Sequence, residues 1–399
     1  MMIFTGKPFR ALTGALIHSP KKKNIIFGAL WLVFSLCGCQ PSAAATLQAT
    51  GPIVHLPTIT LTSTQEPSPT TFPTSTQTIF SSEPGSNVDL SPDKVTETLV
   101  PTAETAGTGQ VTLMAVGDIM LGRTIGDLIQ NKGPEAPFFD TAQTLSSADI
   151  TVGNLECPIS DRGTPEEKTY AFLAPPAAGE SLTFAGFDVV SLANNHSLDY
   201  GPLALQDTFD ILAKHQIVSV GAGMDAAQAY SPVILEVNGL RIAFLAYADI
   251  PASDYDYLAW EAATNKAGIA WAHLDQIRQG VAAAKEIADI VVVLVHNGYE
   301  IVQRVSGDQQ EVAKLAIDSG ASLVIGHHPH VLQRIETYHD GLIAYSMGNF
   351  VFDNFLFPPN YSAILKVELT AEGVQSYEMI DVIVQLNGVP QIMPYDLEE

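Results

Sequence analysis

Five short apolar runs, separated by segments with helical spacing, constrain the fold of this chain more than any other feature of its sequence. Each run is short enough for one buried strand. The runs span residues 111–116, 149–152, 187–193, 290–295 and 322–325. The intervening segments carry apolar residues along one stripe, as amphipathic helices do; they are 202–215, 273–288 and 309–319. Strands that alternate with helices predict an α/β fold.

Two further pairs of apolar segments predict antiparallel strands. Asn238-Gly239 is a two-residue turn between segments 233–237 and 240–248, which is typical of a β-hairpin. The last strands, 363–369 and 377–384, are joined by a short turn and also suggest an antiparallel pair. We therefore expect either one mixed sheet or two sheets.

Each of the five runs leads into polar side chains that are able to bind a metal ion. These side chains are Asp118, Asn154, Glu156, Asn195, His196, His296, His327, His328 and His330. Ligands of α/β folds bind beyond the carboxyl ends of the strands. One polar pair after a strand is usually a turn or a cap, but five successive strand ends predict a shared site. Asn349, at the end of another apolar strand, is a further candidate to line this pocket.

The residue types indicate which chemistry such a site would support. Asp, Asn and His suit a divalent cation, Mn, Fe, Zn or Mg, as one or two ions. Two ions that share a bridging carboxylate activate water against a phosphoester, and a nearby histidine protonates the leaving oxygen. Cys157 is the only cysteine of the expected folded part, which excludes a disulfide framework and a structural zinc finger. Its position beside Glu156 is interpreted as packing rather than nucleophilic catalysis.

The first 108 residues predict export and a tether. Lys21–Lys23 precede about a dozen apolar residues, as in a secretory signal. Leu36-Cys37-Gly38-Cys39 resembles the bacterial lipoprotein cleavage box, which implies a signal over 1–39 and a lipid on Cys39. An ordinary cleaved signal or an uncleaved anchor are the alternatives. Residues 40–108 are dominated by Ser, Thr and Pro and predict a disordered linker, which leaves 109–390 as the folded domain.

The charge of the chain excludes some classes of partner. The chain has 19 basic and 43 acidic residues, a net charge of −24. Such a surface repels nucleic acids and anionic lipid headgroups. An anionic substrate would need local positive charge, from metal ions or from a few arginines. Arg123 is our candidate for that contact; the alternative is an ion pair with a neighbouring Asp.

Six motifs together resemble the CapA family of bacterial capsule and poly-γ-glutamate synthesis proteins, within the calcineurin-like metallophosphoesterase superfamily. The motifs are GDIMLGR (117–123), GNLECPIS (153–160), SLANNHSLDYG (191–201), VLVHNGYE (293–300), VIGHHPHVLQ (324–333) and YSMGNFVFD (345–353). The resemblance covers about residues 111–355. It implies a metallophosphoesterase-like α/β/β/α sandwich with two mixed sheets. It also implies a place on the extracellular face of the bacterial cytoplasmic membrane, with membrane components of a capsule or poly-γ-glutamate synthase as partners.

The same resemblance implies a role for each matching residue. Asp118 and His330 would bind a first metal ion. Asn195, His296 and His328 would bind a second ion. His196 would be the general acid. His327 and Asp199 are additions to the superfamily pattern and are candidates for the pocket, as a partner or an alternative ligand.

Two departures from the superfamily pattern put a dinuclear phosphatase in doubt. Met120 stands where the pattern has a histidine, and Asn154 stands where it has the bridging carboxylate. An amide cannot bridge two cations as a carboxylate does. Glu156 has the chemistry to replace it, because residues 154 and 156 share a face if the strand continues.

Three functions therefore remain open from the sequence. The first is a CapA-like exported protein that acts in capsule or poly-γ-glutamate synthesis, export or anchoring. The second is a metal-dependent phosphoesterase or other hydrolase. The third is a non-catalytic binder of an extracellular polymer, which the net charge disfavours unless metal ions bridge to the anionic polymer.

Overall fold

The computed structural model describes residues 4–5, 109–251, 253, 255–353, 355 and 358–394. The predicted signal and linker, with Cys39, lie outside these residues apart from Phe4–Thr5, so both remain predictions. No helix in the described ranges has the length and apolar character needed to cross a bilayer.

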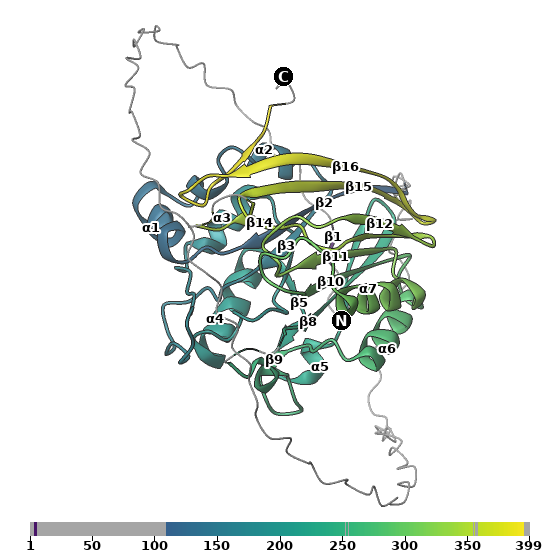
Figure 1. Cartoon of the computed structure of the whole chain (residues 1–399), viewed down its shortest axis with the longest axis horizontal. Coiled ribbons are helices and arrows are strands. Elements are labelled where there is room, and N and C mark those ends of the chain that lie inside the picture. The colour runs from purple at the N-terminus through teal and green to yellow at the C-terminus, as the bar shows by residue number, and fades with distance from the viewer. Residues whose placement is uncertain are drawn as a thin grey trace, which may run out of the picture. The chain divides into compact units, whose positions relative to one another are not determined.

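One sheet has seven strands in the order β1-β7-β8-β10-β11-β13-β12 (Figure 1). Strands β8, β10, β11 and β13 are mutually parallel, whereas β7 and β12 pair antiparallel at the two sides. The hairpin of β7 and β8 is the one that the Asn238-Gly239 turn predicts. The bounds are β1 Phe4–Thr5, β7 Val233–Val237, β8 Leu240–Asp249, β10 Ile290–Asn297, β11 Leu323–His327, β12 Ile335–Tyr338 and β13 Gly341–Ala344.

The second sheet has eight strands in the order β17-β16-β15-β2-β3-β4-β5, with β14 also paired to β2. Strands β2 to β5 are parallel, and β15 to β17 are antiparallel. The bounds are β2 Gln110–Ile119, β3 Ile150–Leu155, β4 Val189–Ser191, β5 Val218–Val220, β14 Asn349–Val351, β15 Tyr361–Thr370, β16 Gly373–Val384 and β17 Pro390–Ile392. A small pair is formed by β6 Ala222–Gly223 and β9 Gly268–Ile269. Two mixed sheets were predicted and are confirmed.

Helices lie on the outer faces of both sheets (Figure 1). Helices α6 and α7 contact strands β8, β10 and β11 of the seven-stranded sheet. Helices α1, α3 and α4 add buried apolar residues to the core of the eight-stranded sheet. The bounds are α1 Arg123–Lys132, η1 Ala136–Phe138, α2 Ala142–Leu145, α3 Ala178–Ala185, α4 Gly201–Lys214, α5 Ala226–Ala229, η2 Tyr257–Trp260, α6 Leu274–Lys285 and α7 Gly307–Asp318.

Strand β10 shows how the layers follow from the sequence. All its side chains are buried, so the run is apolar without alternation. The even-numbered residues 290–294 belong to the core between the two sheets. The odd-numbered residues 291–295 belong to a second core with residues of α6 and α7. The predicted α/β/β/α sandwich is thus confirmed, and the alternation directs His296 into the space between the sheets.

Two glycines allow backbones to approach closely just before site residues. A Cβ atom on Gly117 would lie 1.9 Å from the carbonyl oxygen of Gly348. The Asp118 N–H donates to that same oxygen over 2.9 Å. A Cβ on Gly326 would likewise lie 2.0 Å from the carbonyl oxygen of Tyr345. Any other residue at these positions would push apart the strands that hold the site.

Candidate metal centre

The strand ends of the eight-stranded sheet bring three polar side chains into one row. Asp118 of β2 is in register with Asn154 of β3 on one side and with Asn349 of β14 on the other. Register partners on neighbouring strands share a face of the sheet. All three side chains are fully buried.

The seven-stranded sheet supplies histidines to the same place. His296 ends the inward-facing row of β10, and its Nε2 lies 2.8 Å from Oδ1 of Asn195, in the loop after β4. His328 and His330 follow β11, and the His328 N–H donates to Oδ2 of Asp118 over 3.3 Å. The strand-end argument therefore correctly predicted that these residues meet.

A chain of hydrogen bonds fixes the orientation of the Asn154 amide. The backbone N–H of His196 donates to Oδ1 of Asn194, so Nδ2 of Asn194 points the other way. That Nδ2 donates to Oδ1 of Asn154 over 2.9 Å and to the Leu155 carbonyl. The Asn154 oxygen is thereby occupied, and its nitrogen faces the cluster.

The Asn154 nitrogen occupies the centre of the acidic cluster. It lies 2.8 Å from Oδ1 of Asp118, 3.2 Å from Oε2 of Glu156 and 3.2 Å from Nδ1 of His296. An NH₂ group has two protons for these three acceptors. Asn154 was predicted as a metal ligand. In the structure its oxygen accepts a hydrogen bond from Asn194, so its nitrogen donates to the carboxylates of Asp118 and Glu156.

Glu156 carries the clearest indication that the cluster suits a cation. Its Oε1 is buried and has no hydrogen-bond partner among the described residues. Three imidazole nitrogens face that oxygen: Nε2 of His196 and of His296 at 3.9 Å, and Nε2 of His330 at 3.7 Å. Burial and the charge of Asp118 raise the pKa of Glu156 well above its ordinary value.

A divalent ion would satisfy this unpaired oxygen, because buried charges in proteins are paired or coordinate metals. Asp118, Glu156 and His296 each offer one ligand atom, and these atoms lie within 4.8 Å of one another. We call these three residues the inner group. Its oxygen and nitrogen donors fit the predicted class of cation.

Asp118 and His330 form a polarised pair beside the inner group. Nδ1 of His330 lies 3.2 Å from Oδ2 of Asp118 and 2.9 Å from Oδ1 of Asn349. Burial raises the pKa of Asp118, but His330 outweighs it and holds that pKa well below its usual range. Burial lowers the pKa of His330, but the hydrogen bond to Asp118 more than offsets this, so the pKa is raised. Asn349 therefore supports His330, and Asp118 is ionised.

His196 is held by two buried charged residues. Its Nδ1 lies 2.6 Å from Oδ2 of Asp199, whose Oδ1 accepts from Nζ of Lys168 over 2.6 Å. Burial lowers the pKa of His196 to about 4, although Asp199 opposes the shift. At neutral pH the imidazole is therefore uncharged. Its Nδ1–H binds Asp199 and its Nε2 faces Glu156.

The sequence profile described as "Bacterial capsule synthesis protein PGA_cap" matches residues 112–354, more than half of the chain. The chain belongs to this family. The "Capsule biosynthesis protein CapA" of Bacillus anthracis is 32% identical over 291 residues, which are 71% of this chain and 69% of that protein. The "PGA biosynthesis protein CapA" of Bacillus subtilis (strain 168) is 32% identical over 66% of this chain and 69% of that protein. The resemblance to CapA proteins is thereby confirmed.

A more distant relative is a "Probable polyglutamine synthesis accessory protein" of Mycobacterium tuberculosis (strain CDC 1551 / Oshkosh). It is 27% identical over 285 residues, which are 61% of this chain and 74% of that protein.

Lys168 is a site residue of this PGA_cap family member that the sequence argument missed. It lies in the irregular segment between β3 and α3, not at a strand end. Its side chain is only 3% exposed, and Nζ donates to the Asn195 carbonyl over 2.6 Å. Nζ also lies 4.9 Å from the ring centroids of Tyr257 and Trp260. Lys168 thus ties the Asn195–His196 turn to an aromatic segment that covers it.

Two predicted site residues, His327 and Arg123, have partners within the chain. His327 is buried, and its Nε2 lies 3.1 Å from the Val116 carbonyl oxygen of the other sheet. That contact links the two sheets. Arg123 forms an ion pair with Asp353 and lies 4.6 Å from the centroid of the Phe172 ring. The alternative that we gave for Arg123, pairing with an Asp, is the observed arrangement.

The side chains of Met120 and Cys157 also face the interior. Sδ of Met120 accepts from the Gly122 N–H over 3.2 Å. Sγ of Cys157 accepts from the Leu121 N–H over 3.3 Å. Burial raises the pKa of Cys157 to about 12, which excludes a thiolate nucleophile at neutral pH.

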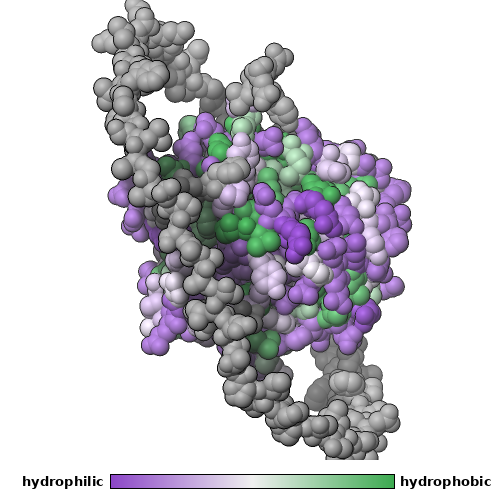
Figure 2. Space-filling model, viewed as in Figure 1, coloured by the Kyte–Doolittle hydropathy of each residue, from purple (hydrophilic) through white to green (hydrophobic). Residues whose placement is uncertain are grey.

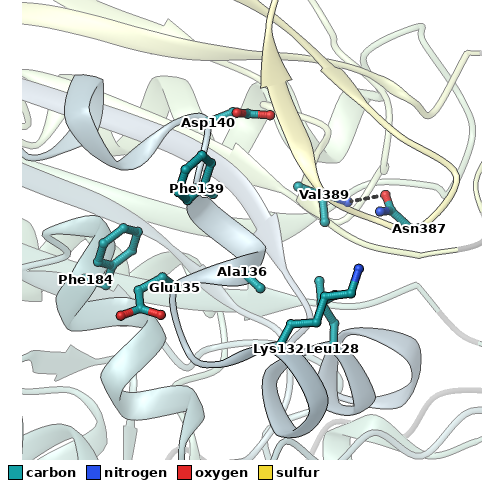
Figure 3. A pocket seen from close by; sticks show the side chains of 9 residues that line it. All are labelled: Leu128, Lys132, Glu135, Ala136, Phe139, Asp140, Phe184, Asn387 and Val389. Atoms are coloured by element: carbon teal, nitrogen blue, oxygen red, sulfur yellow. Dashed lines mark hydrogen bonds between the residues drawn. The ribbon is translucent and has the colours of Figure 1, made fainter. Parts of the chain in front are cut away.

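Two cavities lie outside the histidine cluster. A cavity of about 500 Å³ is lined by α1, η1, α3 and the turn before β17, with Phe139 and Phe184 on one wall (Figure 3). The residues that line it include no predicted site residue. A polar cavity of about 220 Å³ lies at the ends of β8 and β10 and is lined by Asp249, Tyr299 and Asp308, among others.

The visible face of the described part is mostly hydrophilic (Figure 2).

Proposed function

We propose that this chain is an exported protein that takes part in the synthesis, export or anchoring of a capsule or of poly-γ-glutamate. Its membership of the PGA_cap family carries the proposal, with two CapA relatives at 32% identity. A lipid on Cys39 would hold it at the outer face of the cytoplasmic membrane, beside membrane components of a polymer synthase. The signal-like segment and the Ser/Thr/Pro-rich linker of the sequence support this location.

The proposed working part is the buried cluster between the sheets. A divalent cation held by Asp118, Glu156 and His296 would supply positive charge for a carboxylate or phosphate group of the polymer. Asn154 keeps the two carboxylates in place by donating to both of them. Lys168 holds Asn195 and Asp199, which in turn orient His296 and His196 respectively.

The charge of the chain sets a condition on this function. At a net charge of −24, the surface as a whole repels a polyanion such as poly-γ-glutamate. Contact with the polymer is therefore local and depends on bound cations. This condition makes polymer binding sensitive to chelators, whereas binding by a basic patch would be sensitive mainly to salt.

Hydrolysis of a phosphoester or another polymer linkage is the second candidate, and the His196–Asp199 pair favours it. The 2.6 Å contact fixes the tautomer, and the neutral Nε2 faces Glu156. Such a nitrogen accepts a proton from a water molecule or returns one to a leaving oxygen. Hydrolysis of p-nitrophenyl phosphate with Mn²⁺ should fall to background in His196→Ala. Equal rates in both proteins would reject this candidate.

Deletion of the gene in its own bacterium tests the main proposal. We expect cell-bound and released polymer to fall, and the acid hydrolysate to identify it as glutamate or as sugar. Wild-type protein should restore the polymer, whereas Glu156→Gln should not. Cys39→Ala should release the protein from the membrane fraction. Unchanged polymer in the deletion strain would overturn the proposal.

A further inference from the structure

The polar cavity at the ends of β8 and β10 lies on the face of the seven-stranded sheet that α6 and α7 cover. Asp249 lines it from the sheet, two residues after Tyr247, which packs in the core with residues of those helices. Asp308, in the first turn of α7, lines it from the helix. The volume of about 220 Å³ is below the range of about 300–1,000 Å³ that is usual for drug-sized ligands. The cavity therefore suits one small chemical group.

The two carboxylates of this cavity lack a cationic partner. In the part of the chain that the structure describes, neither Asp249 nor Asp308 has a side-chain hydrogen bond or an ion pair. Burial, and then the charge of Asp308, raise the pKa of Asp249. The nearby imidazole of His273 opposes this shift only in part, and its Nε2 is already 2.9 Å from Oε1 of Glu261. A positively charged group in the cavity would stabilise both carboxylates.

A buried amide beside the two acids has an unused donor. Asn297 is in register with Asp249 on the neighbouring strand, so both side chains lie on the same face of the sheet. The next residue, Gly298, lines the cavity, which places the Asn297 amide at its base. Asn297 is only 3% exposed, and its Nδ2 has no hydrogen-bond partner among the described residues. A buried donor without a partner is costly, so this nitrogen calls for an acceptor oxygen from a ligand.

The start of α7 offers further donors on the same side. Ser306 caps this helix and lines the cavity. The capping box uses the N–H groups of Ser306 and Gln309. Of the four N–H groups that a helix start leaves unpaired, those of Gly307 and Asp308 therefore remain for a ligand. A Cβ atom on Gly307 would meet no atom within 4 Å, so this end is open, and the helix dipole favours an anion there.

We propose that this cavity binds an α-amino acid group, with its ammonium at Asp249 and Asp308 and its carboxylate at Nδ2 of Asn297 and the start of α7. The ammonium and the carboxylate of such a group are attached to one carbon atom. They therefore suit a small cavity that offers carboxylates and N–H donors together. Tyr299, which is 50% exposed, also lines the cavity and offers its ring to the apolar part of the ligand.

The amino-terminal residue of poly-γ-glutamate carries such a group. Each γ-linkage consumes the α-amino group of the following residue, so only the amino end keeps an ammonium beside its α-carboxylate. The net charge of −24 repels the other residues of the polymer, whereas the terminal ammonium is attracted to the two acids. Asn297 directly follows His296, so the cavity and the metal cluster share one edge of the sheet. That the group belongs to the polymer rests on the proposed function, whereas the preference of the cavity does not.

Binding of three probes to the full-length purified chain tests the proposal by titration calorimetry. The probes are γ-linked triglutamate, its N-acetyl derivative and free glutamate, all in EDTA so that no bound cation attracts their carboxylates. N-acetylation removes the ammonium and should weaken binding about tenfold or more, because hydrogen bonds to charged groups are the strong ones. Asp249→Asn and Asp308→Asn should abolish this preference for the free amine. Asp127→Asn, an exposed acid on α1, is the matched control and should keep it.

The probes also test the carboxylate contact. Isoglutamine, in which the α-carboxylate of glutamate is an amide, should bind the wild type less tightly than glutamate does. Asn297→Leu should reduce that difference. Circular dichroism of each variant checks that the fold is retained, and the comparison of free and N-acetylated probes on the wild type needs no variant at all.

Three results would overturn the inference: no binding of glutamate or triglutamate to the wild type, equal binding of the free and N-acetylated probes, or the same preference in Asp249→Asn. If glutamate binds and γ-linked triglutamate does not, the cavity takes the free amino acid and the polymer end is rejected as its ligand. If the probes bind as expected but deletion of the gene leaves the polymer unchanged, the cavity stands and the proposed function fails.

Discussion

Replacing Asn154 by Asp tests the claim that the Asn154 amide holds the Asp118 and Glu156 carboxylates together at the centre of the cluster. The substitution is nearly isosteric but places an oxygen where Nδ2 now donates, 2.8 Å from Asp118 and 3.2 Å from Glu156. At an effective dielectric constant of about 20, a charged carboxylate at position 154 and the charge of ionised Asp118 would repel by about 6 kcal/mol at such a distance. A carboxyl group in that field takes up a proton instead of remaining charged.

The cost of that protonation sets the size of the effect. Holding a carboxyl protonated near pH 7, against an ordinary pKa of about 3.9, costs about 4 kcal/mol at 1.36 kcal/mol per unit. We therefore expect Asn154→Asp to lose about 4 kcal/mol of unfolding free energy in EDTA, and less at lower pH, where the unfolded chain is protonated too. A divalent cation removes the repulsion. Mn²⁺ at about a thousand times its dissociation constant should restore about 4 kcal/mol.

Urea unfolding followed by circular dichroism, in EDTA and in Mn²⁺, measures both quantities. Asn387→Asp is the matched control, because Asn387 is exposed and its Oδ1 accepts from the Val389 N–H, which an Asp oxygen also does. If Asn154→Asp is as stable as the wild type in EDTA, the amide does not hold the carboxylates as described. If neither the variant nor the wild type gains stability from Mn²⁺, the cluster is not a cation site.

Three further outcomes are expected. Lys168→Met should cost about 3–5 kcal/mol in the same urea assay, because it removes the positive charge that faces the buried Asp199 carboxylate; a loss below about 1 kcal/mol would contradict this. In EDTA, the free energy of unfolding should fall as the pH drops from about 6.5 to 4. Over this range His196 takes up a proton in the unfolded chain, whereas in the folded chain burial lowers its pKa to about 4. A flat profile of urea midpoints would oppose that account. Cys157 should resist iodoacetamide until the chain unfolds, as peptide mass spectrometry will show, and labelling of the native chain would refute its burial.

Local patterns were sufficient to predict an α/β fold and the meeting of the strand ends, whereas the sandwich of two mixed sheets was predicted from the resemblance to the CapA family. The Asn238-Gly239 turn and the continuous apolar run of β10 depend on neighbours in sequence, which is why both were predicted. The order of polar strand ends predicted that Asp118, Asn195 and His296 would converge, because parallel strands deliver their ends to one edge.

What the sequence could not supply depends on orientation rather than position. Whether Asn154 offers oxygen or nitrogen is decided by Asn194, through a bond to the backbone of the His196 turn. Three histidines in GHHPH could not be ranked by spacing, because the positive φ of His328 breaks the alternation after His327. Lys168 had no signal at all, since an isolated lysine in an irregular segment is usually a surface residue.

The cluster draws its side chains from both sheets, with Asp118 and Glu156 from one and His296 from the other. Neither sheet alone supplies all three of these metal-ligand candidates. A cation bound there would link the two sheets. Binding of the ion would therefore be coupled to the packing of one sheet against the other. If the chain is exported, as proposed, and crosses the membrane unfolded, it would acquire its ion outside the cell, after the two sheets have packed together.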